Sequence, residues 1–441
     1  MNTSKYLNAL LYLWYIIFFV SMICCFRAIS SITLALILVT GLLKNKIDTG
    51  SWFNINLINS FLIACCLFYL LQAMGLLFTV PLHSGAKHLQ LKSAIVFIPF
   101  AICCSNYLNG LVRQKLMSWY IWILAAVFFY CLSIALHKYF FLHAQNDVFF
   151  YHQLVSPFKQ HAVQVSIVLF AGFVYLLEKT RTGIYFQNKS IHLLLIIYFT
   201  CCILLLSSKL VILFSGVCLV YYFILALQKK LHNRCIIFTS LLSGLVMIIL
   251  VLSTQNRISK RFNEITSGDI NLIQQQNFDP GIYFNGLQLR LLEGRFVKEI
   301  LTEQHAWLTG VSGDAQILLN KKYISAHMYI GDGITADQGY LGYNTHNQFI
   351  ESLLQSGIIG LLTFILVCYT MVRLAIRRKN RELTIITILL IAYCFNESVF
   401  ETQYGITLFT FFPLFLYFGT AQTWDQKNSP QKTTLFQMIT S

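Results

Sequence analysis

The stretch that decides the fold runs from Gly342 to Leu362 and reads GYNTHNQFIESLLQSGIIGLL. Polar residues lead into Thr345, and Gln348 follows three positions later, which is the spacing of a capping box at the start of a helix. The sequence is then almost wholly apolar as far as Val372, long enough to cross a bilayer at about 1.5 Å per residue. We therefore predict a membrane helix with His346 in its first turn, at the membrane surface.

The position of His346 at the start of this helix suggests chemistry. Free backbone amides and the positive end of the helix dipole favour a neutral imidazole, and they also favour an anion that docks beside it. A neutral histidine next to an anion site has what a general base needs. The alternative is an amphipathic side chain that is only solvated at the interface, and spacing alone does not separate the two.

The composition indicates a polytopic membrane protein, because 57% of the 441 residues are hydrophobic and only 11% are charged. We predict an all-α transmembrane bundle of about 12 spans. The expected spans lie near residues 6 to 26, 29 to 43, 56 to 80, 93 to 109, 117 to 136, 161 to 177, 191 to 206, 209 to 228, 235 to 253, 348 to 372, 383 to 397 and 404 to 420. The first apolar run has no small-residue cleavage site, so we expect it to stay as a membrane helix.

The charge distribution predicts the topology. Lys and Arg number 32 against 17 acidic residues, and they concentrate in alternate short loops, as the positive-inside rule requires. Membrane topology therefore explains the excess of basic over acidic residues, and nucleic acid is not an expected partner. We divide the chain into residues 1–253 with nine spans, 254–345 as a periplasmic loop or lid with an amphipathic helix, 346–421 with three spans, and 422–441 as a cytoplasmic tail.

The 13 cysteines include four adjacent pairs within or at the ends of spans, and none lies between residues 253 and 345. We interpret them as small apolar packing residues rather than a disulfide framework. The sequence contains neither a CxxC nor an HExxH pattern, so no metal is expected.

The outer segment contains the stretch NGLQLRLLEGRFVKEILTEQ at residues 285–304. Its apolar residues recur at steps of three and four, which predicts an amphipathic helix that could lie on the membrane surface, with Arg290 and Arg295 on it. A run rich in Gly and Tyr follows, up to Tyr343, and we expect an irregular lid there. Tyrosines and glycines above His346 suit a sugar-binding surface, although a structural loop uses the same residues.

Three further charged residues are candidates. Lys209 follows Ser207 and Ser208 in a tight outer turn, where it either snorkels to the interface or faces the same surface as His346. Lys159 ends the outer loop before the sixth span, where a phosphate could reach it. Glu401, in the last outer turn, could orient the imidazole or bind an acceptor, unless it is only a solvated carboxylate.

Together these residues resemble the O-antigen ligase and polymerase superfamily, integral-membrane glycosyltransferases of the C-type class. The resemblance covers the Arg290-led helix with the following LTGVSGD at 308–314, the His346–Asn347 pair with GIIGLL at 357–362, and the Ser208–Lys209 turn. The stretch NESVFETQYG at 396–405 is similar to the acidic end segment of ligase-like members. The family usually has arginine where this chain has Lys209, which keeps the charge but loses the bidentate fork.

The resemblance implies transfer of a glycan from a polyprenyl diphosphate carrier to an acceptor hydroxyl, such as that of lipid A-core, without metal, nucleotide or other cofactor. The expected location is the periplasmic face of the bacterial inner membrane, among membrane lipids. His346 would be the catalytic base. Arg290 would bind the diphosphate, and the other expected substrate-binding residues are Lys209, Asn347, Arg295, Lys159 and Glu401.

Several functions remain open. We favour a ligase because of the single large outer loop and the acidic end segment, while a polymerase or a protein O-oligosaccharyltransferase would carry similar catalytic parts. A polysaccharide flippase or transporter is the alternative from another class. Such a protein would be expected to show charged residues deep within spans or an internal repeat, and we find neither in the sequence.

Overall fold

The computed structural model of this chain describes residues 2–52, 59–75, 82–105, 107–228, 242, 244, 270–279, 281–330 and 339–419. Within these ranges the chain forms helices and no strand, which confirms the all-α prediction. One large hydrophobic core joins the helices of the bundle, and a second, smaller core is formed by residues between α10 and α15 together with Leu354 of α15. The cysteines within the same ranges are free thiols, and most are buried.

Most helices of the bundle coincide with predicted spans, whereas the helix Leu82–Lys92 lies between the spans predicted at 56–80 and 93–109. The elements of the bundle are α1 (Asn2–Ile23), α2 (Arg27–Thr49), α3 (Ser60–Gly75), α4 (Leu82–Lys92), α5 (Ala94–Ser105), α6 (Gly110–Phe141), α8 (Ala162–Thr182), α9 (Lys189–Leu205), α10 (Lys209–Gln228), α15 (Gln348–Arg378), α16 (Arg381–Cys394) and α17 (Gln403–Phe418). Six helical segments are long and apolar enough to cross a membrane, and four shorter helices are also apolar, counting only the described ranges. This supports a multi-pass membrane protein. The predicted span at 235–253 and the tail at 422–441 lie outside the described residues.

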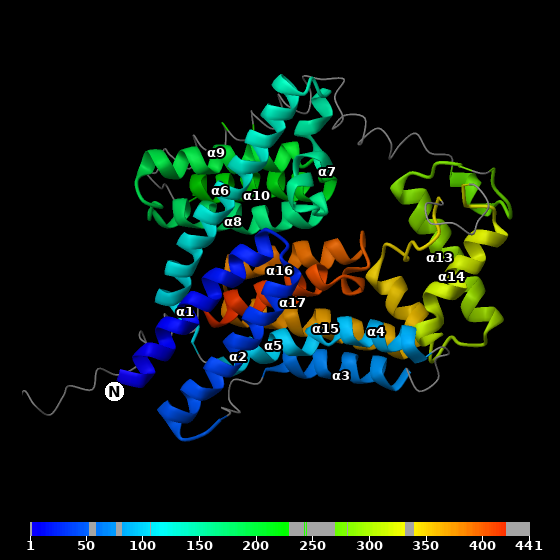
Figure 1. The fold of residues 1–441 in the computed structure, drawn as a ribbon, viewed down its shortest axis with the longest axis horizontal. Helices are drawn as coiled ribbons and strands as arrows, with labels where there is room; N and C mark the ends of the chain where they lie inside the picture. The colour runs from blue at the N-terminus through cyan, green and yellow to red at the C-terminus, as the bar shows by residue number, and fades with distance from the viewer. Residues whose placement is uncertain are drawn as a thin grey trace, which may run out of the picture.

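A separate group of helices lies beyond one end of the bundle (Figure 1). It contains η5 (Ile270–Gln274), α13 (Gly286–Glu303), η6 (Ser312–Asp314) and α14 (Ala315–Ser325). We call the described residues of this part of the chain, 270–279, 281–330 and 339–346, the α13–α14 segment. Helix α15 begins beside this segment and runs through the bundle, where it packs against α3 and α16. The segment η3 (Asn146–Phe149), α7 (Tyr151–Leu154) and η4 (Ser156–Phe158) connects α6 to α8. Another short element, η7 (Val399–Glu401), connects α16 to α17.

The amphipathic helix predicted at 285–304 is present as α13, but its apolar face is not turned to a membrane surface. Leu292, Phe296 and Ile300 are buried in the smaller core, which also takes in residues of α14 and Leu354 of α15. Part of the predicted irregular lid is helical and forms α14. Tyr323 of α14 packs its ring edge-on against Phe296 of α13, with 5.8 Å between the ring centroids. The apolar face of α13 therefore packs against protein and not against lipid.

Helix α15 breaks one third of the way along its length. Ser356 (φ −136°, ψ 18°) and Gly357 (φ 62°, ψ −159°) leave the helical conformation. The amide of Ile358 donates to the carbonyl of Trp307 at 2.8 Å, so the α13–α14 segment takes up a backbone donor that the break sets free. The break thus fastens this segment to the membrane helix.

Two glycines allow the backbones to meet at this break. A Cβ on Gly357 would clash with the backbone of Leu308, and a Cβ on Gly310 would clash with the backbone at Gln355. The close neighbour of Gly357 is therefore the 308–310 loop.

Replacing Gly357 with alanine should destabilise the protein, because alanine at positive φ is strained and its Cβ meets backbone atoms that cannot rotate away. We expect a loss of more than about 1 kcal/mol, measured as a lower thermal midpoint of the detergent-solubilised protein. Gly216→Ala is the matched control, because nothing lies within 4 Å of its added Cβ in α10. Equal melting of Gly357→Ala and Gly216→Ala would contradict this account of the break.

Candidate functional site

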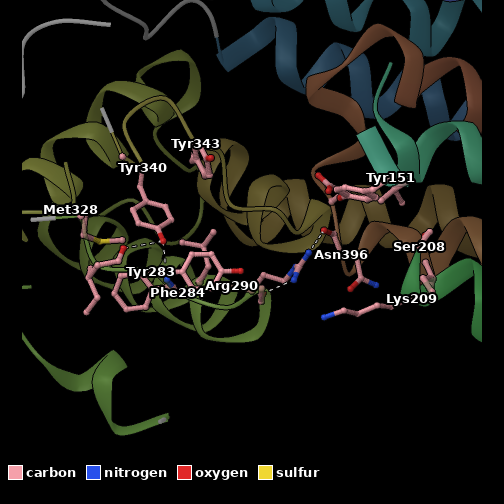
Figure 2. Close-up of a pocket in the computed structure, with 18 of the residues that line it drawn as sticks. Tyr151, Ser208, Lys209, Tyr283, Phe284, Arg290, Met328, Tyr340, Tyr343 and Asn396 are labelled. Carbon is pink, nitrogen blue, oxygen red and sulfur yellow. Dashed lines mark hydrogen bonds between the residues drawn. The ribbon is translucent and has the colours of Figure 1, made fainter. Parts of the chain in front are cut away.

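A cavity of about 510 Å³ lies between the α13–α14 segment and the adjacent ends of the bundle helices. Figure 2 shows Lys209 and Arg290 directed toward it from opposite sides, with Asn396 between them. Aromatic and polar side chains complete the wall, including Tyr151, Ser208, Tyr283, Tyr340, Tyr343 and Glu397. The structure therefore brings two of the predicted site cations to one cavity.

His346 lies next to this cavity rather than in its lining. Its ring is 5.3 Å from the ring of Tyr343, which does line the cavity, and its side chain is 24% exposed. Its backbone has φ 44°, in the left-handed region. This conformation turns the chain immediately before α15 begins.

The helix start differs by two residues from the predicted capping box. The side chain of Asn347 caps α15 by accepting from the amides of Phe349 and Ile350, so His346 precedes the helix instead of lying in its first turn. Asn347 was expected to bind substrate, and its side-chain oxygen is instead used for capping. Asparagine is as good an N-cap as threonine, and the sequence alone did not separate the two.

The two residues of the predicted capping box have other partners. The hydroxyl of Thr345 donates to Glu351 at 2.8 Å and lies 3.2 Å from the hydroxyl of Ser398. The side-chain oxygen of Gln348 accepts from the amide of Phe400 at 2.6 Å. These contacts fasten the chain around His346 to the turn between α16 and α17.

The imidazole of His346 is held by a buried carboxylate that we did not predict. Its Nδ1 lies 3.1 Å from Oε1 of Glu293 on α13 and 2.9 Å from the carbonyl oxygen of Asn344. A carbonyl oxygen only accepts, so Nδ1 carries a proton and donates. This tautomer leaves the lone pair of the neutral ring on Nε2.

The carboxylate also reverses the expected electrostatics of His346. Burial alone would lower the pKa of His346, but the hydrogen bond and charge of Glu293, together with the charge of Glu397, outweigh it and raise that pKa. Burial raises the pKa of Glu293, and His346 and Arg290 offset this only in part. The helix start was expected to favour the neutral imidazole, whereas the carboxylates beside His346 shift its pKa in the opposite direction. The ring is a stronger base than an isolated histidine.

Arg290 has a structural task as well as a place in the cavity wall. Its Nε donates to the carbonyl of His346 at 3.2 Å, and one terminal nitrogen donates to the carbonyl of Asn396 at 2.6 Å. The other terminal nitrogen donates to the carbonyl of Gly286. Since a guanidinium has five N–H donors, one on each terminal nitrogen remains for a ligand. Arg290 thus ties α13, His346 and the end of α16 around the cavity.

Glu397 is the acidic member of the cavity wall. Burial raises its pKa, and the charges of His346 and Arg290 oppose that shift. Glu397 and Glu401 both lie between α16 and α17, and Glu397 is the one that lines the cavity. The cavity therefore offers two cations and one carboxyl group.

The other predicted binding residues lie elsewhere. Arg295 pairs with Glu299 at 3.2 Å and donates to the carbonyl of Gln275 at 2.7 Å, so it anchors the chain near η5 to α13. Arg295 follows Arg290 by five residues on α13, so its side chain faces another side of the helix. Lys159 is exposed, ends η4 with φ 50° and does not line the cavity. The structure gives neither residue a role in this site.

Glu401 belongs to a separate polar cluster below the start of α15. It accepts from Lys92 at 3.0 Å and from Gln355 at 2.9 Å, and His88 lies 3.6 Å away. Burial alone would raise the pKa of Glu401, but the charge of Lys92 and hydrogen bonds from His88 and Gln355 hold it below its usual range. This carboxylate supports the buried end of α15 and does not contact His346.

The sequence contained a signal for Glu293. It is the one acidic residue on the apolar stripe of α13, between Leu289 and Phe296, and it is fully buried. A carboxylate in such a place needs a partner, because burying an unpaired charge is costly. The same helix pattern that predicted α13 could have identified this residue.

The Glu293–His346 contact predicts a measurable shift. Glu293→Gln removes the negative charge but keeps the side-chain shape, so the pKa of His346 should fall below its value in the parent protein. Selective labelling of histidine ring carbons and a pH titration by NMR would measure it. Glu303→Gln, at the exposed end of α13, is the control and should leave the titration unchanged. An unchanged midpoint in Glu293→Gln would exclude the contact.

Comparison with known proteins does not assign this site. No protein-family model matches the chain, and no curated protein is similar to it at a significant level. Its function has to be inferred from its own residues and geometry.

Proposed function

We propose that this chain is a membrane glycosyltransferase that moves a glycan from a polyprenyl diphosphate carrier to an acceptor hydroxyl. The observation that carries the proposal is the pairing of His346 with Glu293 beside a cavity that contains Arg290 and Lys209. The cavity lies where the bundle helices end, so the phosphates of a lipid-linked donor can enter it while the lipid chain stays in the bilayer.

The cavity suits the leaving group of such a donor. A sugar on a diphosphate is already activated, so the protein must only stabilise the diphosphate as it departs. Arg290 and Lys209 supply positive charge, and Lys209 is also the first residue of α10, where the positive end of the helix dipole adds to it. Lys209 provides a point charge and not the bidentate fork of an arginine. The tyrosines in the wall offer aromatic faces and hydroxyls to sugar rings.

His346 suits the acceptor side of the reaction. Its Nε2 takes the proton of the acceptor hydroxyl, while Glu293 holds Nδ1 and stabilises the imidazolium that forms. The acceptor oxygen bonds to the anomeric carbon, the bond from that carbon to the phosphate oxygen breaks, and the diphosphate leaves with the electron pair. A single in-line displacement of this kind inverts the anomeric configuration. A product with retained configuration would exclude it.

The resemblance in sequence guides the choice of acceptor. It favours an O-antigen ligase that transfers to lipid A-core at the periplasmic face of the inner membrane. A polymerase and a protein O-oligosaccharyltransferase need the same donor chemistry and differ in acceptor. The lipopolysaccharide of a deletion strain separates the candidates: unattached polymer on carrier lipid indicates a ligase, a core bearing single repeats indicates a polymerase, and repeat units trapped inside indicate a flippase.

Replacing His346 with alanine should reduce transfer by roughly 10²–10⁴-fold, the usual contribution of a general base. A cell-free assay with purified protein, a polyprenyl diphosphate-linked glycan and candidate acceptors would measure this. His137→Ala is the control, because its side chain is exposed on α6 and does not line the cavity, so activity should be kept. Equal rates for the His346→Ala variant and the parent would refute the proposed base.

A further inference from the structure

A second cavity lies at the opposite end of α15 from His346. Its volume is about 540 Å³. The ends of four bundle helices form its wall: the start of α6, the end of α8, the end of α15 and the start of α16. Since α15 has 31 residues, the two cavities are separated by the length of a membrane helix.

The wall of this cavity is strongly basic. Seven of its side chains are Lys or Arg, and two are carboxylates. Both carboxylates are already used: Arg113 pairs with Glu382 at 2.8 Å, and Arg181 pairs with Glu178 at 2.5 Å. Within the described part of the chain, the other five cations have no carboxylate partner. Five positive charges around one cavity repel each other unless an anion lies among them.

Lys and Arg side chains make up most of this wall, and each carries several N–H donors. Phosphate oxygens combine acceptor capacity with negative charge, and arginine favours them.

Exposed aliphatic side chains lie in the wall of the cavity and near it in sequence. Ile184, which lines the cavity, is 54% exposed. Leu111 and Ile376, each close in sequence to a cation of the wall, are 72% and 67% exposed. Large exposed aliphatic side chains next to a phosphate-binding surface suit the acyl chains of a lipid, whereas a free phosphate makes no apolar contacts with them.

We propose that this cavity binds the phosphate headgroup of an anionic phospholipid, on the membrane surface opposite the site of His346. The seven cations of the wall bind the phosphate, and Ile184 contacts the acyl chains. The site is independent of the transfer reaction proposed above, and its test does not require activity.

The test uses the full-length protein, purified in neutral detergent and stripped of lipid. Dioctanoyl phosphatidylglycerol, dioctanoyl phosphatidylcholine and sodium pyrophosphate are each titrated, with binding followed by native mass spectrometry and by thermal midpoint. The variant Arg377→Gln/Arg378→Gln removes two charges from the wall. Its control, Lys115→Gln/Lys189→Gln, removes two exposed charges from the same end of the bundle outside the wall.

We expect phosphatidylglycerol to bind the parent and the control equally, and to bind the Arg377→Gln/Arg378→Gln variant roughly 30-fold more weakly. Should that variant not fold, Arg377→Gln alone changes only an exposed side chain and should weaken binding roughly fivefold. Equal binding of phosphatidylcholine and phosphatidylglycerol, or an equal loss in the control, overturns the site. Pyrophosphate that binds as tightly as phosphatidylglycerol overturns the lipid assignment.

Discussion

The backbone of α15 breaks at Ser356 and Gly357, and the α13–α14 segment closes onto that break. The carbonyl of Trp307 accepts the amide of Ile358, and the amide of Val311 donates to the carbonyl of Leu354 at 2.9 Å. Leaving such a buried amide without a partner costs about 1–3 kcal/mol. Because this contact fixes the segment against the membrane helix, α13 has one position relative to the residues that precede α15. The site depends on that position.

The consequence is a buried charge at the edge of the bundle. With α13 in place, Glu293 has no solvent contact and lies beside the imidazole of His346, while Arg290 joins the same helix to Asn396. In surroundings of low dielectric, these charges interact far more strongly than at a wet surface. Arg290 and Lys209 face each other across the cavity, and the imidazole of His346 lies next to it, which is the arrangement that the proposed transfer requires.

Much of the bundle could be predicted from the sequence, because apolar runs of span length leave few alternatives in a membrane protein. The place of Lys209 followed from its tight turn, and His346 followed from the polar stretch before α15. The partners of Asn347, Arg295 and Glu401 were not predicted, because sequence spacing does not show them: a helix amide, a loop carbonyl and a buried lysine. Contacts between segments that are distant in the sequence determine the partners of Arg295 and Glu401.

The most direct measurement is a cryo-electron microscopy structure of the protein with an uncleavable polyprenyl phosphonophosphate sugar. The account places the two phosphorus atoms between Arg290 and Lys209, with the anomeric carbon on the side of His346 and an acceptor-sized space before its Nε2. A diphosphate bound away from these cations, or a sugar whose anomeric carbon faces away from His346, would contradict it.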